Sequence, residues 1–144
     1  MRCEQLMKTT VQWLAEGQSV EEAARRMREF DIGFLPICNA VGEVSGTLTD
    51  RDITVRVTAN GRAADRCLVE EVMTREVVAV RPEDEVARAE QLMAQYHKSR
   101  ILVTDDAHKL KGVISLSDVA TYDTAHRAST TLRHVASREA KGST

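Results

Sequence analysis

Two short segments of this chain place a hydroxyl residue three positions before an aspartate, at the end of a strand candidate. They are Thr49 to Asp52 and Ser115 to Asp118. A hydroxyl at the start of a helix lies among backbone N–H groups without intrahelical partners and can help to hold a phosphate. A carboxylate one turn later can accept hydrogen bonds from two vicinal hydroxyls, as on a ribose. The hydroxyl residue and the aspartate of each segment are therefore candidate binding residues: Thr49, Asp52, Ser115 and Asp118.

The same spacing also has a purely structural interpretation. Ser/Thr-x-x-Asp is a capping box, in which the side chains satisfy the first backbone N–H groups of a helix and bind nothing else. The occurrence of this frame at the same place in both halves of the chain favours binding, although a duplicated cap would give the same pattern. The spacing alone leaves both interpretations open.

The frame is duplicated because most of the chain is duplicated. Residues 6–58, moved forward by 66 positions, align with the second half without a gap and pair Gly46 with Gly112 and Asp52 with Asp118. This period exceeds the repeats of common solenoids, so each copy is expected to be a βαββα-sized unit. A unit of this size is marginal alone and is expected to bury its apolar face against its twin.

The elements that must position these residues follow from hydrophobic periodicity and turn signals. The first copy predicts a strand over 11–14, a helix over 20–30, strands over 34–38 and 44–48, and a helix over 49–58. The second copy predicts a strand over 77–80, a helix over 84–97, strands over 100–104 and 111–114, and a helix from Ser115. Helical turns are expected at 3–7 and 69–73.

The repeat also predicts the domain organisation. We expect repeat 1 over residues 1–58, a linker over 59–68, repeat 2 over 69–123 and a polar tail over 124–144. In the tail, Leu132 and Val135 are the apolar residues available for burial, which predicts a marginal helix or a disordered end.

Composition narrows the class of protein. The 20 basic and 22 acidic side chains give a net charge of −2 with interspersed signs, so neither nucleic acid nor a membrane surface is expected as a partner. The sequence contains no long apolar run, which predicts a soluble, cytoplasmic protein. Cys3, Cys38 and Cys67 fit neither a disulfide framework nor a metal knuckle and are expected to pack as small hydrophobes. Neither a catalytic arrangement nor a metal site is expected, so the protein is not predicted to be an enzyme.

The order of these motifs resembles a tandem pair of CBS domains, often called a Bateman module, over about residues 5–123. The resemblance depends on the Val-x-x-Ala-x-x-x-Met helix, the Gly-Phe-Leu-Pro-Ile segment at 33–37, and the segments that end at Asp52 and Asp118. It implies an α/β fold of two βαββα repeats packed sheet to sheet about a pseudo-twofold axis. It also implies clefts between the repeats that take adenosyl compounds, and association into a homodimer.

The resemblance assigns residues to two clefts. One cleft would use Thr49, Asp52, Thr74 and Ala79. The other would use Arg100, Ser115, Asp118 and the region of Thr9 and Trp13.

The two clefts are expected to differ in chemistry. The planar fork of Arg100 suits a phosphate, whereas its counterpart in the first copy, Phe34, cannot donate hydrogen bonds. Trp13 stands where the second copy has Ala79. Its indole would either stack on a purine or fill the pocket.

Two functions from different classes follow. The leading hypothesis is a regulatory module that senses AMP, ADP, ATP or a related adenosyl compound without catalysis or a resident cofactor, and passes the change to a protein target that the sequence does not name. The alternative is a structural dimerisation or interaction module, in which the two frames only cap helices. A further possibility is redox control through Cys3 and Cys38.

Overall fold

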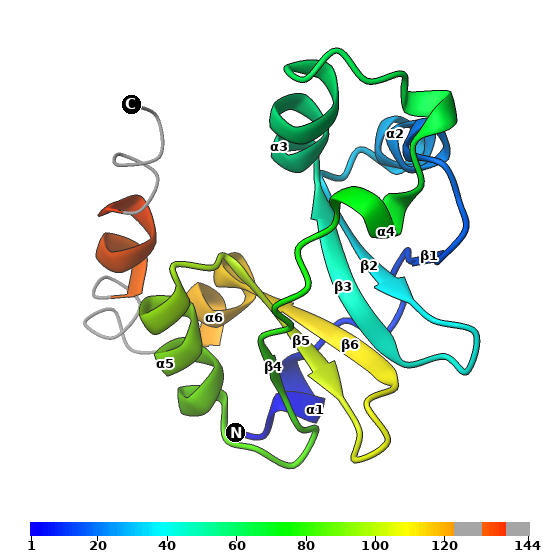
Figure 1. The fold of residues 1–144 in the computed structure, drawn as a ribbon. Helices are drawn as coiled ribbons and strands as arrows, with labels where there is room; N and C mark the ends of the chain where they lie inside the picture. The colour runs from blue at the N-terminus through cyan, green and yellow to red at the C-terminus, as the bar shows by residue number, and fades with distance from the viewer. Residues whose placement is uncertain (123–130, 138–144) are drawn as a thin grey trace. The chain divides into compact units, whose positions relative to one another are not determined.

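The structure is a computed structural model that describes residues 1–122 and 131–137. It divides into two compact units (Figure 1). The first unit is Gln12–Val77, and the second unit combines Met1–Val11 with Val78–Thr144. The N-terminal segment of the chain therefore belongs to the unit that is built mainly from the second sequence repeat.

The first unit contains a three-stranded sheet of order β1-β2-β3, with β1 parallel to β2 and β2 antiparallel to β3. Its elements in chain order are β1 (Leu14–Ala15), α2 (Val20–Phe30), β2 (Phe34–Cys38), β3 (Val44–Thr49), α3 (Asp50–Asp52), the π-helix η1 (Ile53–Thr58), the 3-10 helix η2 (Ala64–Arg66) and α4 (Val69–Val72).

The second unit repeats this plan with a sheet of order β4-β5-β6. Its elements are α1 (Cys3–Leu6), β4 (Ala79–Val80), α5 (Val86–Tyr96), β5 (Arg100–Thr104), β6 (Leu110–Ser115) and α6 (Leu116–Tyr122). The predicted α/β fold with two βαββα repeats is confirmed. Among the described helices, none has the length and hydropathy needed to cross a bilayer.

The short helical turns α1 and α4 relate the compact units to the sequence repeats. The two turns are 66 residues apart, as predicted, and each contributes buried side chains to a core built mainly from the other sequence repeat: Val69 and Val72 to the first unit, Cys3 and Leu6 to the second. The compact units are thus offset from the sequence repeats by the length of these turns and the segments that follow them.

Two predicted elements are shorter than expected, and one differs in type. The strand expected over 11–14 is replaced by the two-residue strand β1, which shares only Leu14 with the predicted range, and the strand expected over 77–80 is shortened to β4. These strands pair through Leu14↔Ile37, Ala15↔Cys38, Ala79↔Leu102 and Val80↔Val103. The helix expected over 49–58 begins one residue after Thr49, which serves as its N-cap, and continues from α3 into the π-helix η1.

The core of the first unit explains which sheet face remains for binding. Val20, Ala23 and Met27 form the apolar stripe of α2 and pack with Leu35 and Leu48 of the sheet. Because alternate residues of a strand face opposite sides, the register Leu35↔Leu48 directs the neighbouring pair Phe34↔Thr49 to the other face. The second unit has the same arrangement.

Part of the tail is helical. Residues 131–137 form a helix, in which Val135 is buried and Leu132 is exposed. Its anchor at the end of α5 is His97, whose Nδ1 lies 2.9 Å from the carbonyl oxygen of His134. The rest of the predicted tail, residues 124–130 and 138–144, lies outside the described residues, as does residue 123 at the end of the predicted second repeat.

Candidate functional site

Both predicted frames form reciprocal capping boxes. The Thr49 N–H donates to Asp52 Oδ2 at 3.0 Å, and the Asp52 N–H donates to Thr49 Oγ1 at 3.1 Å. In the second unit, the Ser115 N–H donates to Asp118 Oδ2 at 3.0 Å, and the Asp118 N–H donates to Ser115 Oγ at 3.2 Å. The capping hydrogen bonds predicted from the spacing are therefore confirmed. They occupy one carboxylate oxygen of each aspartate.

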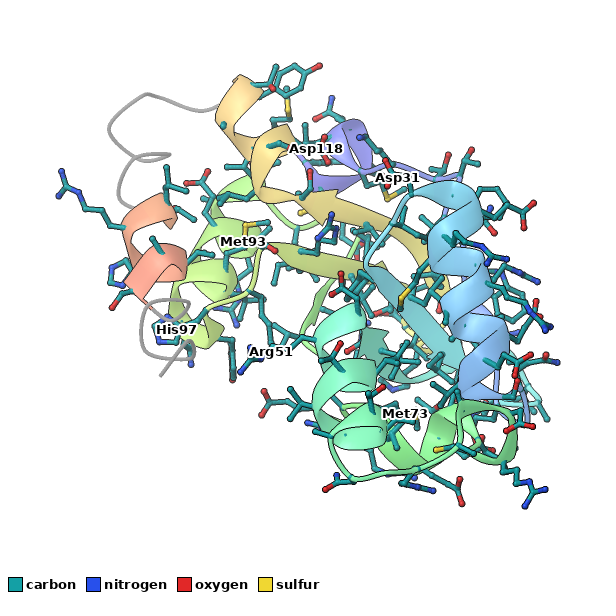
Figure 2. The ribbon with its side chains drawn as sticks, turned by 90° about the horizontal axis from the view of Figure 1, so that it is seen from above. Asp31, Arg51, Met73, Met93, His97 and Asp118 are labelled. Atoms are coloured by element: carbon teal, nitrogen blue, oxygen red, sulfur yellow. The ribbon has the colours of Figure 1, made fainter. Side chains whose placement is uncertain are left out.

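The second carboxylate oxygen of each aspartate faces a cation. Asp52 Oδ1 lies 3.9 Å from Arg56 Nε, and Asp118 Oδ1 lies 3.6 Å from Lys8 Nζ. Both aspartate side chains are 15% exposed, and Asp118 lies on α6 (Figure 2). A carboxylate oxygen held by a side-chain cation, rather than by the backbone, can exchange that partner for a ligand hydroxyl.

Arg56 connects Asp52 to the segment that follows α4. Its guanidinium Nη1 donates to the carbonyl oxygens of Val72 at 2.9 Å and Met73 at 3.3 Å. These carbonyls lie at the C-terminal end of a helical turn, where they lack helical N–H donors. Arg56 therefore helps to fix the backbone beside Asp52, a role that the sequence analysis did not predict.

Thr74 lies beside the strand that ends at Thr49. The N–H of Thr47 donates to the Thr74 carbonyl at 2.9 Å, and the N–H of Thr74 donates to the Thr47 carbonyl at 2.8 Å. A Cβ atom on Gly46 would lie 2.8 Å from this Thr74 oxygen, so glycine is required for the approach. Because Thr47 and Thr49 face the same side of β3, the structure brings Thr74 to the predicted site in the first unit.

Lys8 occupies the equivalent place in the second unit. Lys8 and Val113 exchange two backbone hydrogen bonds of 3.0 Å, and a Cβ atom on Gly112 would lie 2.7 Å from the Lys8 oxygen. Val113 faces the same side of β6 as Ser115. Lys8 was not predicted as a site residue, although the period of 66 that aligns the repeats also aligns Lys8 with Thr74.

Arg100 lies directly across the sheet from Ser115. The register of β5 and β6 pairs Arg100 with Ser115, and the register of β2 and β3 pairs Phe34 with Thr49. Directly opposite residues of an antiparallel pair have neighbouring side chains on one face. The predicted difference between Arg100 and Phe34 therefore falls next to the hydroxyl residue of each frame.

Each unit thus carries a candidate site on the sheet face away from its core. The first site consists of Phe34, Thr49, Asp52, Arg56 and Thr74. The second site consists of Lys8, Arg100, Ser115 and Asp118.

Ala79 belongs to the second unit and Trp13 to the first, so each lies in a different unit from the aspartate with which it was predicted to share a cleft. Trp13 is 47% exposed, and its predicted role against a purine stays a prediction.

The three cysteines are buried and free, as expected of small hydrophobes. Burial, followed by the nearby charges of Asp84 and Glu85, raises the pKa of Cys3 to about 11. Burial also raises the pKa values of the Cys38 and Cys67 thiols. These shifts keep the thiols in their less reactive protonated form. Among the described residues, no group of three or more His, Cys, Asp or Glu side chains could hold a metal ion.

Comparison with known proteins places these features in a family. The CBS domain family model matches residues 3–58 and 69–124. The chain is 40% identical over 114 residues to the CBS domain-containing protein YhcV of Bacillus subtilis, and this alignment covers 79% of each chain. It is 29% identical over 121 residues to Hypoxic response protein 1 of Mycobacterium tuberculosis, and that alignment covers 84% of each chain.

Solved structures agree with this comparison. Hypoxic Response Protein I with two coordinated zinc ions superposes with a TM-score of 0.78 and 27% identity, covering 86% of this chain and 100% of that one. The CBS domain pair of protein MJ0100, in complex with 5′-methylthioadenosine and S-adenosyl-L-methionine, superposes with a TM-score of 0.74 and 24% identity, covering 84% and 94% of the two chains. With two family matches over two copies of the same α/β unit, this chain belongs to the CBS domain family as a tandem pair.

Proposed function

We propose that this CBS pair is a regulatory module that binds an adenosine-containing ligand such as AMP, ADP, ATP or S-adenosylmethionine. The observation that carries the proposal is the duplicated frame in which each aspartate caps a helix with Oδ2 and presents Oδ1 to a side-chain cation at 3.6 or 3.9 Å. The adenosyl ligands of the MJ0100 pair support the same class of ligand for a protein of this fold.

The chemistry of the frame suits a nucleoside. The Oδ1 atoms of Asp52 and Asp118 would accept the ribose hydroxyls, and the cation now beside each would turn to the ligand or to water. Thr49 and Ser115 would donate their hydroxyl hydrogens to a phosphate oxygen or another acceptor. Ligand binding would then exchange contacts within each site without breaking the backbone cap.

A regulatory role requires that the ligand bind one conformation of the protein better than another. We propose that the module acts on a protein target in the cytoplasm, and that two copies associate into a homodimer, as the family resemblance implies. The ligand changes the balance of conformations by no more than its differential affinity for them.

The alternative function is a structural module without a ligand. The completeness of both capping boxes favours it, because the caps account for the Ser/Thr-x-x-Asp spacing without any binding. The two functions make different predictions for substitutions that separate the cap from the carboxylate charge.

The decisive experiment is thermal unfolding of the full chain with AMP, ADP, ATP, S-adenosylmethionine and 5′-methylthioadenosine. A ligand at about 100 times its Kd adds roughly 2.7 kcal/mol, a shift of several degrees for a domain of this size. Each ligand is then tested with Asp52→Asn and Asp118→Asn. Asparagine keeps one oxygen for the cap and removes the charge and the second carboxylate oxygen.

If the carboxylates bind ligand, the asparagine variants keep nearly the basal Tm and lose the ligand-induced shift of their own site. The matched control is Asp105→Asn, since Asp105 also accepts backbone N–H donors, from Ala107 and Lys109, at the far end of the β5–β6 hairpin. This control should retain the full ligand shift. A wild-type protein that shifts with none of the five ligands would refute the proposal and favour the structural module.

A further inference from the structure

Asn60 is followed directly by Gly61 in an exposed turn after η1. Asparagine is a thermolabile residue, because the backbone nitrogen of the next residue can attack the carbon of its side-chain amide. Glycine hinders this attack least, since it has no side chain. Among the described residues, nothing lies within 4 Å of the place where a Cβ atom on Gly61 would stand. The neighbouring segments therefore leave room for the reaction.

Hydrogen bonds of the native turn restrain both reacting groups. Asn60 Nδ2 donates to the carbonyl oxygens of Arg56 at 3.1 Å and Val55 at 3.5 Å. The Gly61 N–H donates to the carbonyl oxygen of Thr58 at 3.1 Å. These bonds lie at the exposed end of a helix, where local opening requires less free energy than global unfolding. Because the attack must break them, we expect it to be about tenfold slower in the folded than in the unfolded chain.

Asn39 provides a comparison within the same unit. Its Oδ1 accepts the N–H groups of Val41 at 3.1 Å and Glu43 at 3.0 Å, and its Nδ2 donates to Glu43 Oε1 at 3.1 Å. The next residue is Ala40, whose methyl group hinders attack by its backbone nitrogen. Asn39 is therefore expected to stay intact under conditions in which Asn60 reacts.

We propose that Asn60 is a site of spontaneous deamidation, and that this modification loosens the C-terminal end of η1. The Gly61 nitrogen forms a bond to Asn60 Cγ and closes a succinimide ring. The Cγ–Nδ2 bond breaks, and Nδ2 leaves as ammonia with the proton that the Gly61 nitrogen loses. Water then opens the ring at either of its carbonyl groups, which leaves an aspartate or an isoaspartate. The proposal does not depend on the proposed function.

The products reverse the interaction that the side chain makes with the helix. The amide group of Asn60 donates hydrogen bonds, whereas an ionised carboxylate only accepts them. The carbonyl oxygens of Val55 and Arg56 repel a carboxylate, and a negative charge is unfavourable at the C-terminal end of a helix. Arg56 also holds the backbone at the end of α4. The modification therefore acts on a residue of the first candidate site.

The test is incubation of the full chain at mildly alkaline pH, with and without urea, followed by digestion with trypsin and mass spectrometry. Cleavage after arginine releases Asn60 in the peptide 57–62 and Asn39 in the peptide 29–51. We expect the mass increase of deamidation in 57–62 and not in 29–51, with a rate about tenfold higher in urea. An isoaspartate-specific protein methyltransferase should label 57–62 as well. Asn60→Gln, which keeps an amide but closes the larger ring poorly, is the matched control and should stay unlabelled.

The structural consequence is tested with Asn60→Asp and Asn60→Ala. Both variants lose the amide donor, and Asn60→Asp also places a negative charge at the end of η1. Thermal unfolding at pH 7 should therefore give a Tm about 1–3 degrees lower for Asn60→Asp than for Asn60→Ala.

Each part of the proposal has its own refutation. Deamidation at Asn60 is refuted if 57–62 gains no more mass and isoaspartate than 29–51, or no more than the same peptide of Asn60→Gln. The restraint by the native turn is refuted if the reaction is as fast in the folded chain as in urea. The loosening of η1 is refuted if Asn60→Asp is as stable as Asn60→Ala.

Discussion

The first and second units share one backbone arrangement at their candidate sites but differ in the side chains around it. Each has a strand that ends in a hydroxyl residue, a reciprocal cap to an aspartate, and a neighbouring segment that approaches a glycine too closely for a Cβ atom. The two units differ in charge, because the second unit has Lys8 and Arg100 at the positions where the first unit has Thr74 and Phe34. The comparison teaches that the repeated residues maintain the backbone, and that the residues free to differ set the chemistry of each site.

The largest expected effect tests whether the two cores are equivalent. Met27 and Met93 are related by the repeat, and Met93 is fully buried, whereas Met27 is 8% exposed. Met93→Ala should lower the free energy of unfolding by about 2–5 kcal/mol, and Met27→Ala by less, because its cavity can be partly filled by water or neighbours. Urea denaturation measures both. A greater loss for Met27→Ala would contradict the ranking.

A second variant tests the close approach that positions Lys8. Gly112→Ala places a Cβ atom 2.7 Å from the Lys8 oxygen, so the Lys8 segment must move, and we expect a loss of about 1–3 kcal/mol in the free energy of unfolding. Gly46→Ala should cost a similar amount in the first unit. The comparison is Gly17→Ala, where nothing lies within 4 Å of the new Cβ but the φ is 94°, so its cost reports backbone strain without a clash. Gly112→Ala variants as stable as wild type would show that the approach is not required.

A third prediction concerns pH, because Cys3 of the second unit stands where the first unit has Val69. Folding raises the pKa of Cys3 from 9.0 to about 11, so the unfolded chain loses this proton first as pH rises. The contribution of the buried Cys3 thiol to the free energy of unfolding is fully present below pH 9. It falls as pH rises, and the loss approaches about 2 kcal/mol near pH 11. Cys3→Val should remove that part of the alkaline loss. Denaturation curves between pH 8 and pH 11 measure it, and identical pH profiles for the two proteins would refute it.

A fourth prediction compares the two hairpin loops. His108 has a φ of 63°, where the first unit has Gly42 with a φ of 86°. A side chain disfavours this left-handed conformation, although glycine also makes the unfolded chain more flexible. His108→Gly should therefore stabilise the protein by about 0.5–1 kcal/mol, while Gly42→His should destabilise it. Thermal unfolding of both variants gives the sign, and a lower Tm for His108→Gly would contradict the prediction.

The smallest effect is expected at the residue that starts each hairpin loop. Asp105 Oδ1 accepts the N–H groups of Ala107 and Lys109, and Asn39 Oδ1 makes the equivalent bonds in the first unit. Asp105→Asn should therefore leave Tm at pH 7 within about one degree of wild type. The N–H bond from Lys109 holds the pKa of Asp105 below its usual 3.8. The wild type should lose this stabilisation as pH falls through that lowered pKa, and the asparagine variant should not.

Local features of the fold were predictable because they depend on residues that are close in sequence. The helical spacing of Val20, Ala23 and Met27 predicted α2, and the Ser/Thr-x-x-Asp spacing predicted the caps at Thr49 and Ser115, which the structure confirms. The strands β1 and β4 were predicted too long, since their ends are determined by how far they pair with β2 and β5 rather than by their own residues.

The repeat and the α/β class could be read from the amino-acid sequence alone, as could the paired strands and the position of each aspartate within its frame, because hydrophobic period and capping act over a few residues. Three features became visible only in the folded chain: Met1–Val11 belongs to the second unit, Lys8 lies against Val113 and Asp118, and Arg56 contacts the carbonyls at the end of α4. Those contacts join segments far apart in the chain. They form only where backbone pairing and the absence of a side chain at Gly46 and Gly112 allow the two segments to approach.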